Sequence, residues 1–374
     1  MTFDRRTALM ILAALPGLGP VNIRKLDQLI KGGVHRLLEM ETDEQANWCS
    51  ASIVSQLQNF RKFFDPDQVR QELDRQGADF ITCEDEEYPA QLAPFSDRPI
   101  GLYRNRAGVK TPDRAIAIVG TRKPSSYGRR VAREFARDLS LSGFCIVSGL
   151  AEGIDTEAHD ATLATDGRTC AVLGGGLAHC YPHSNRFLME QIQLSGGVWT
   201  EFPIWRKADR RSFPQRNRIV AGLSEAVLVV ESGNTGGSLI TARMASEQGK
   251  NVYVIPGRID APESTGCHEL IREGAQLVTS VDEILQDLNH LPGILKAASG
   301  PFRSSQRIAV HDAAEKLGAK PLKIWEYLSA KRQGNVDKIA DGTGLKAPEV
   351  VGLLLDMELD GYVNRKLDGN YEIA

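Results

Sequence analysis

Residues 115–148 read AIAIVGTRKPSSYGRRVAREFARDLSLSGFCIVS, and this stretch decides the fold class. The runs Ala115–Val119 and Phe144–Ser148 are short, apolar and rich in β-branched residues, which predicts two buried strands. Between them apolar residues recur at a helical spacing, which predicts a helix over residues 129–141. A helix between two near-continuous apolar strands is typical of a parallel sheet that is covered by helices on both faces.

The same alternation continues to residue 288. Further strands are predicted at Thr169–Leu173, Val198–Glu201, Ala226–Val230 and Asn251–Ile255. Further helices are predicted at Thr156–Ala164, Asn185–Leu194, Pro214–Leu223, Gly237–Gln248 and, as a closing helix, Val281–Leu288. We therefore predict a doubly wound α/β domain over residues 85–288, with Tyr88–Tyr103 as its approach segment.

The flanking sequences predict two smaller domains. Residues 1–84 carry helical periodicities and predict a helical domain of SAM or helix-hairpin-helix type. Its turn at residues 15–26, LPGLGPVNIRKL, fits a helix-hairpin-helix that holds a DNA phosphate on free amides, and it fits a compact helical joint equally well. Residues 289–320 predict a linker. Residues 321–374 predict three helices and a hairpin around Asp368-Gly369, together a winged helix.

Charge and composition narrow the function. The 374 residues carry a formal charge of -3, which disfavours a uniformly basic nucleic-acid coat protein. Two windows, 122–137 and 205–218, each have a net charge of +5, and the rest of the chain carries -13. The six cysteines form no C-x-x-C pair, and no apolar segment reaches the roughly 18 residues that span a bilayer. We expect a protein of the reducing cytoplasm.

Glycine-rich turns follow the predicted strands, at the sheet edge where doubly wound folds bind ligands. Neither the dinucleotide fingerprint nor the P-loop spacing occurs at the first turn. Arg122 follows the first strand, whereas Arg216 and Arg218 follow a helix start at Phe213-Pro214. Because arginine binds phosphate through a fork of donors, several such groups on one edge predict a polynucleotide backbone as ligand. The arginines of 129–137 are expected on a solvated helix face.

Signatures of catalysis are missing from the sequence. There is no H-E-x-x-H motif, no paired-cysteine metal spacing and no G-x-S-x-G elbow, and the seven histidines are dispersed. Asp155 and Glu157 stand at a helix start, where acids favour the helix dipole. We expect no enzymatic activity, no metal and no cofactor.

Five long motifs resemble the DprA/Smf family, the DNA-processing proteins of bacterial natural transformation. They are AIVGTR at 117–122, SGLAEGID at 148–155, FPQRNRIVAGLS at 213–224, GSLITA at 237–242 and GCHELI at 266–271. The resemblance implies an extended Rossmann-like domain in a non-enzymatic protein that binds and protects single-stranded DNA, forms a homodimer and helps to load the recombinase RecA.

Site residues are also implied by the resemblance. The implied DNA-binding residues are Gly120, Thr121, Arg122, Lys123, Gly149, Gly174, Gly175, His183, Arg216, Asn217 and Arg218. The implied dimer contacts are His268, Leu270 and Ile271, of which the last two fit core positions equally well. His183 stands where the family often has lysine, so phosphate binding there is expected to be weaker or pH-dependent.

Two competing functions remain. A nucleotide-processing Rossmann enzyme of the lysine-decarboxylase-like (phosphoribohydrolase) type is suggested by Gly236-Gly237, although its P-G-G-x-G-T-x-x-E signature is missing. A transcription regulator that uses the winged helix is disfavoured, because residues 321–374 contain seven basic and nine acidic residues and the third helix has no lysine or arginine. We expect this domain to contact protein rather than DNA.

Overall fold

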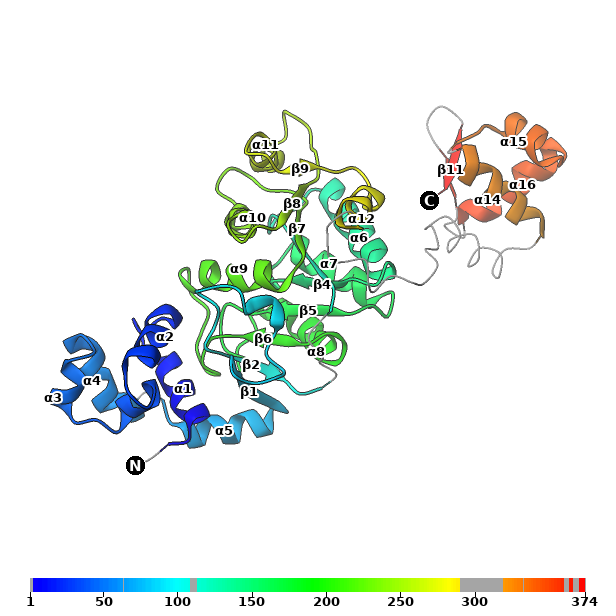
Figure 1. Ribbon diagram of the computed structural model, residues 1–374. Coiled ribbons are helices and arrows are strands. Elements are labelled where there is room, and N and C mark those ends of the chain that lie inside the picture. Colours follow the sequence, from blue (N-terminus) through cyan, green and yellow to red (C-terminus); the bar gives the residue numbers. More distant parts are fainter. Residues whose placement is uncertain are drawn as a thin grey trace. The chain divides into compact units, whose positions relative to one another are not determined.

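Figure 1 shows the computed structural model of the chain, whose contacts divide it into two compact units, Met1–Ile294 and Leu295–Ala374. No helix among the described residues is long and apolar enough to cross a membrane. The predicted linker falls, at residues 290–318, outside the described residues. The structure describes residues 3–62, 64–107, 113–289, 319–331, 333–359, 363–365 and 370–373.

A nine-stranded sheet forms the centre of the first unit, in the order β1-β2-β6-β5-β4-β3-β7-β8-β9. The strands from β6 to β9 in this order run parallel, whereas β1 pairs with β2, and β2 with β6, in antiparallel direction. Their bounds are β1 Ala78–Thr82, β2 Gly101–Asn105, β3 Ala115–Val119, β4 Cys145–Ser148, β5 Thr169–Val172, β6 Val198–Thr200, β7 Ala226–Val229, β8 Asn251–Val254 and β9 Gln276–Leu277.

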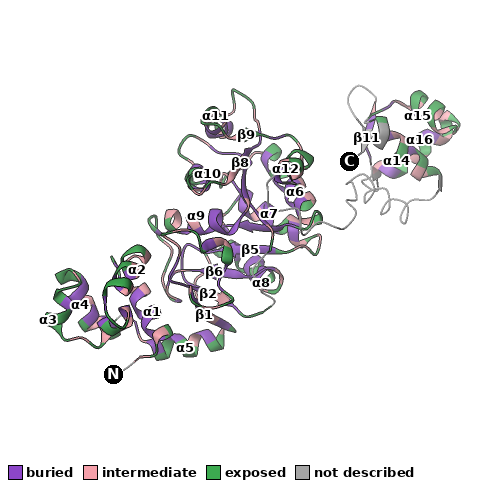
Figure 2. Cartoon of the chain, in the orientation of Figure 1, coloured by how far each residue is buried: buried purple, intermediate pink, exposed green. Residues whose placement is uncertain are grey.

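Helices cover both faces of this sheet (Figure 1). One face carries α6 (Ser126–Leu141), α7 (Ile154–Leu163), α8 (Arg186–Ser195) and α12 (Val281–Asn289). The other carries α9 (Ser212–Leu223), α10 (Gly237–Glu247) and α11 (Thr265–Arg272). Because side chains alternate along a strand, Ile116 and Ile118 pack towards α6 and α7 while Ala117 and Val119 pack towards α9. The strands are accordingly buried throughout the centre of the fold (Figure 2).

The predicted strands between residues 115 and 255, the helices between them and the closing helix are all confirmed. The prediction of a wholly parallel sheet is wrong at one edge. Tyr88–Tyr103 was expected to be only an approach segment, but it leads into β2, and β1 lies inside the range 1–84 that was predicted to be helical. Both strands are five residues long and follow helical or irregular sequence, so their alternation gives only a weak signal. The short elements α11 and β9 were also missed.

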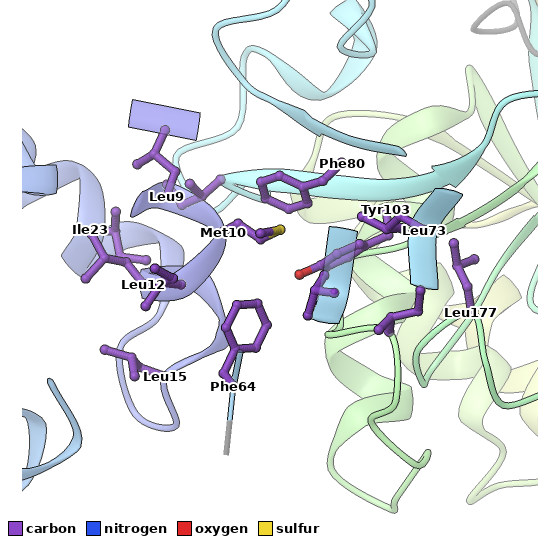
Figure 3. Close-up of a cluster of buried hydrophobic side chains, with 14 of the residues drawn as sticks. Leu9, Met10, Leu12, Leu15, Ile23, Phe64, Leu73, Phe80, Tyr103 and Leu177 are labelled. Carbon is purple, nitrogen blue, oxygen red and sulfur yellow. The ribbon is translucent and has the colours of Figure 1, made fainter. Parts of the chain in front are cut away.

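Five helices precede or flank this antiparallel edge, and α1 and α5 pack directly on its strands. They are α1 (Arg5–Ala14), α2 (Pro20–Leu29), α3 (Thr42–Ala46), α4 (Ala51–Asn59) and α5 (Pro66–Arg75). Figure 3 shows Leu9, Met10 and Leu12 of α1 in one buried cluster with Phe80 of β1 and Tyr103 of β2. The helices therefore share their hydrophobic core with the sheet.

The second unit contains α14 (Ala319–Lys331), α15 (Val336–Thr343) and α16 (Ala347–Leu359), followed by the antiparallel pair β10 (Val363–Arg365) and β11 (Tyr371–Ile373). These bounds confirm the three predicted helices and the two predicted strands to within two residues or so of each helix end. The predicted turn Asp368-Gly369 lies outside the described residues. A small core that includes Ile324, Leu354 and Val363 holds the unit together.

One buried histidine makes the fold sensitive to acid. His159 of α7 is fully buried, its Nδ1 lies 2.6 Å from Thr169 Oγ1, and its Nε2 has no hydrogen-bond partner. Burial, with the positive charge of Arg216 as a smaller cause, lowers the pKa of His159 to about 3. Below a pH of about 6.5, His159 therefore binds a proton in the unfolded chain but stays neutral in the folded chain. This difference lowers the free energy of unfolding as the pH falls from about 6.5 to 3.

We expect His159→Leu to remove this cost. Between pH 7 and pH 4 the wild type should lose about 3 kcal/mol more unfolding free energy than the variant, as measured by urea unfolding at each pH. His183→Gln, which changes an exposed histidine, serves as the control and should keep the wild-type pH profile. Parallel profiles for wild type and His159→Leu would contradict the assignment.

Candidate nucleic-acid interface

A cavity of about 260 Å³ opens at the point where the chain changes direction across the sheet. The strands β3, β4, β5 and β6 are laid down outward from β3, and the chain then returns to place β7 on the other side of β3. The loops after β3 and β7 therefore separate, and such switch points form the ligand crevices of open α/β sheets. The cavity is lined by Val119, Gly120, Thr121, Arg122, Gly149, Ala151, Asp155, Phe213, Arg216, Asn217, Val220, Gly236, Gly237, Ser238 and Thr241.

Arg122 lies at the mouth of this cavity, where its positive charge can contact a ligand. Its exposed guanidinium lies 5.0 Å from the ring centroid of Phe213, and it forms no ion pair within the described part of the chain. The loop that carries it is fixed by Glu231, whose carbonyl accepts the N–H of Thr121 at 2.7 Å. The Glu231 carboxylate also accepts the N–H and hydroxyl of Ser125 at 2.9 and 2.5 Å. A cation held in place and stacked on an aromatic ring is suited to a phosphate or a nucleobase.

Arg216 forms the floor of the cavity and is only 5% exposed. Its Nη1 donates to the Val172 carbonyl at 2.6 Å, while its Nε has no partner. Burial lowers the pKa of Arg216 to about 10, against the opposing effect of the Asp155 carboxylate. Asp155 is itself buried and accepts the N–H groups of Gly149 and Ala151 at 3.0 and 3.3 Å. Burial raises the pKa of Asp155, and Arg216 lowers it less strongly.

Glycines let the backbone approach these groups. A Cβ on Gly149 would lie 1.9 Å from Arg216 Nη1, so no larger residue fits beside the buried guanidinium. On the opposite wall α10 begins at Gly237 behind the N-cap Gly236, and a Cβ on Gly237 would meet no atom within 4 Å. Asn217 donates to the Gly237 carbonyl at 3.3 Å, which ties this helix start to α9. A helix N-terminus and two arginines thus face the same space, an arrangement that favours anions.

The helix α9, which carries four of the lining residues, is held at its C-terminal end by Lys250. The Lys250 ammonium donates to the carbonyls of Ala221 and Gly222 at 2.8 and 2.6 Å, and to that of Ser224 at 2.5 Å. A cation at the C-terminus of a helix offsets the helix dipole and satisfies its last carbonyls. Burial nevertheless lowers the pKa of Lys250 to about 8.

Several of the predicted DNA-binding residues gather at this cavity, and others do not. Gly120, Thr121, Arg122, Gly149, Arg216 and Asn217 line it, and Lys123 is exposed beside Arg122. Gly174 and Gly175 are buried, because Phe213 covers the first and residues 206–208 cover the second. His183 is exposed at a short 3₁₀ helix, and its neighbours Tyr181 and Pro182 line a smaller cavity with Arg122 and Phe213.

Arg218 does not line the cavity. It forms an ion pair with Glu201, and its Nε lies 3.8 Å from Asp97 Oδ2. Both partners of the first pair are largely buried, with side chains 12% and 15% exposed. Residues 216 and 218 are two apart on one helix and point in different directions, so the motif alone does not show which arginine faces the ligand.

We therefore expect Arg218→Ala to act on stability. Removal of the guanidinium leaves Glu201 buried without its partner, which should lower the free energy of unfolding by about 3 kcal/mol. The double variant Arg218→Met/Glu201→Met should recover most of this loss in chemical denaturation. The salt dependence of DNA binding should stay at the wild-type value, and a reduced salt slope with unchanged stability would show instead that Arg218 contacts phosphate.

Asp155 and Glu157 at the start of α7 were expected only to favour the helix dipole, but both also interact with residues outside their helix. Asp155 holds the glycine turn and faces Arg216, whereas Glu157 is buried and pairs with Arg129 and Arg133 of α6. Arg130 and Arg137 lie near Glu134 and Asp138, so the expectation of a solvated face for these four arginines is confirmed by their exposure. Asp155, Phe213 and Tyr181 were missed as site residues, although the first two stand in the motifs at 148–155 and 213–224.

The predicted dimer contacts lie on α11. Leu270 is 3% exposed and belongs to the core between α11 and the sheet, as its alternative interpretation proposed. Ile271 and His268 are partly exposed, and the His268 Nε2 lies 3.0 Å from the Gly257 carbonyl. Within the described residues no group of three or more histidine, cysteine, aspartate or glutamate side chains is placed to hold a metal ion.

Fold and site together define a doubly wound α/β protein with an anion-binding cavity at its switch point. The chain belongs to the family of DNA recombination-mediator protein A, the DprA/Smf family, whose model matches residues 79–289. Protein Smf from Synechocystis is 37% identical over 297 residues, which cover 74% of this chain and 71% of that protein.

Two solved structures of the same family resemble this chain. DNA processing protein A from Streptococcus pneumoniae has a TM-score of 0.63 at 31% identity and covers 77% of this chain and 99% of its own. DNA processing protein A from Helicobacter pylori, whose structure gives insight into its single-stranded DNA binding mode, has a TM-score of 0.51 at 29% identity. It covers 56% of this chain and 95% of its own.

Proposed function

We propose that the cavity at the switch point binds single-stranded DNA. The observation that carries the proposal is the exposed Arg122 guanidinium, without an ion pair in the described residues and stacked 5.0 Å from the ring centroid of Phe213, above the buried Arg216. One cation for the backbone beside aromatic rings for the bases is the combination that single-strand binders use. The similarity to the Helicobacter pylori protein, whose structure describes such binding, supports the same ligand.

Membership of the DprA/Smf family supports a proposal for the wider role. We propose that the chain acts as a homodimer that protects incoming single strands in the cytoplasm and promotes their loading with RecA during natural transformation. The partly exposed His268 and Ile271 of α11 are the proposed dimer contacts. The six cysteines are free thiols, which supports a reducing compartment.

Neither flanking domain is proposed to bind DNA. Arg24 of the turn at residues 15–26 donates to the carbonyls of Ser96, Arg98 and Pro99 at distances of 2.6–3.1 Å. This use of Arg24 favours a compact joint over a phosphate-binding hairpin. In the second unit, which we interpret as a winged helix, α16 exposes Val351 and Leu355 and carries no lysine or arginine, so we propose a protein partner for it.

We further propose that the chain is not an enzyme. The titratable groups of the cavity, Asp155, Arg216 and Arg122, include no carboxylate that is free to act as a base, because Asp155 is buried against two backbone N–H groups and Arg216. A phosphoribohydrolase function remains the alternative, and release of free base from nucleoside monophosphates by the purified chain would establish it.

A binding titration tests the proposal. We expect the full chain to bind a mixed-sequence single strand of about 20 nucleotides at least tenfold more tightly than the same sequence as a duplex in 0.1 M salt. Fluorescence anisotropy measures both affinities. Equal affinity for both forms, or a preference for the duplex, would contradict the proposed ligand.

A further inference from the structure

Half of the twelve basic residues in the two positive windows, 122–137 and 205–218, are already paired with acids. Those with carboxylate partners within 4 Å are Arg129, Arg130, Arg133, Arg137, Arg206 and Arg218. Exposed residues of the same windows without an ion pair in the described part of the chain are Arg122, Lys123, Lys207, Arg210 and Arg211. The last three form a group of their own in the segment Trp205–Arg211, just before α9.

This basic segment, Trp205–Arg211, has an ordered backbone although it is neither helix nor strand. The Arg206 carbonyl accepts the N–H of Gly176 at 2.8 Å, and a Cβ on Gly175 would lie 2.9 Å from both that carbonyl and the Ala208 nitrogen. At the other end the Asp209 carboxylate accepts the N–H groups of Arg211 and Ser212 at 2.7 and 2.8 Å. Because the backbone is fixed before any ligand arrives, little entropy is lost when its side chains bind.

The basic segment leads directly into the cavity described above. Phe213, whose ring lies under the Arg122 guanidinium, follows Arg211 by two residues. An extended chain spans two residues in at most about 7 Å. Lys207 precedes Phe213 by six residues, or at most about 22 Å. The three cations are thus within reach of a polyanion that starts at Arg122. Trp205, which is 43% exposed, adds an aromatic face at the far end.

We propose that Lys207, Arg210 and Arg211 bind the phosphates of nucleotides that flank those in the cavity. The inference rests on the proposed function and deepens it. One DNA strand runs from Arg122 along the basic segment, and a base of this strand stacks on the exposed Trp205. The contacts are made to the backbone and are independent of sequence. Strands too short to leave the cavity gain nothing from the segment, whereas longer strands gain affinity and a steeper dependence on salt.

Strand length therefore tests the inference. The full chain and the variant Lys207→Gln/Arg210→Gln/Arg211→Gln are titrated with labelled oligothymidylates of about 4 and about 20 nucleotides over a range of salt. For the longer strand we expect the salt slope of the variant to fall by about 2, since each single-strand phosphate contact contributes about 0.7. Its affinity at 0.1 M salt should fall at least tenfold. For the shorter strand the affinities should agree within about twofold.

A charge-matched control separates contact from net charge. Lys31→Gln/Lys62→Gln/Arg130→Gln removes the same charge from exposed positions outside the basic segment and should keep the wild-type slope. A wild-type salt slope for Lys207→Gln/Arg210→Gln/Arg211→Gln would overturn the inference, and so would an equal loss of affinity for short and long strands. In either case, a loss of short-strand binding in Arg122→Ala would still support the cavity as the DNA-binding site. Absence of single-strand binding by the wild type would overturn the proposed function as well, and a variant that loses only duplex affinity would show the segment to be a duplex contact.

Discussion

Replacement of Gly149 by alanine is expected to damage both folding and binding, with a loss of about 3 kcal/mol in the free energy of unfolding. The new Cβ would lie 1.9 Å from Arg216 Nη1 and 2.4 Å from its Cζ, so the guanidinium has to move. It lies in the core beside Asp155, and a displaced Arg216 leaves a buried carboxylate poorly compensated. Single-strand affinity should fall at least tenfold because the cavity loses its floor. Chemical denaturation and anisotropy measure the two effects.

A glycine in the same cavity provides the control. Gly237→Ala adds the same methyl group where no atom lies within 4 Å, at the start of α10. Its unfolding free energy should match the wild type within about 0.5 kcal/mol. If Gly149→Ala were as stable as Gly237→Ala, the close packing of Arg216 against Gly149 would be refuted.

Replacement of Arg122 by alanine is expected to affect binding alone. The side chain is exposed and lies over Phe213 without an ion pair in the described residues, so its removal should change stability by no more than about 0.5 kcal/mol. A charge-assisted contact to phosphate contributes about 1.5–3 kcal/mol, which corresponds to roughly a 10- to 100-fold loss of single-strand affinity. The salt slope should fall by about 0.7.

Arg122→Lys distinguishes charge from geometry. Lysine keeps the positive charge but has neither the planar fork nor the flat face that stacks on Phe213. We expect Arg122→Lys to retain the wild-type salt slope with an affinity between those of the wild type and Arg122→Ala. Unchanged affinity in Arg122→Ala, measured with a short single strand, would remove Arg122 from the site.

Most of the fold follows from the sequence, because strands that are buried on both faces need continuous apolar runs. Ala115–Val119 has the same bounds in the structure as in the prediction. The antiparallel edge could not be predicted from the sequence, because Ala78–Thr82 and Gly101–Asn105 form strands only by pairing with each other. In this pair Ala78 lies opposite Asn105 and Thr82 opposite Gly101. Their pairing is a tertiary property that local periodicity does not encode.

The candidate site was predictable in its position and less so in its members. Glycine turns and arginines after parallel strands place it at the carboxyl edge of the sheet, and Arg122 and Arg216 are found there. The role of Arg218 depended on Glu201, which is 17 residues away in the chain and reaches it only through the fold. In the same way the free cations of the basic segment became evident only when the ion pairs of the other arginines were known.

A crystal structure of the full chain with a short oligothymidylate tests the central claim most directly. We expect a phosphate of the strand within about 2.7–2.9 Å of the Arg122 guanidinium, with the neighbouring nucleotide in the cavity between Gly149 and Gly237. A strand bound elsewhere, for example along the turn at residues 15–26 or on α16, with the cavity at the switch point empty, would contradict the account.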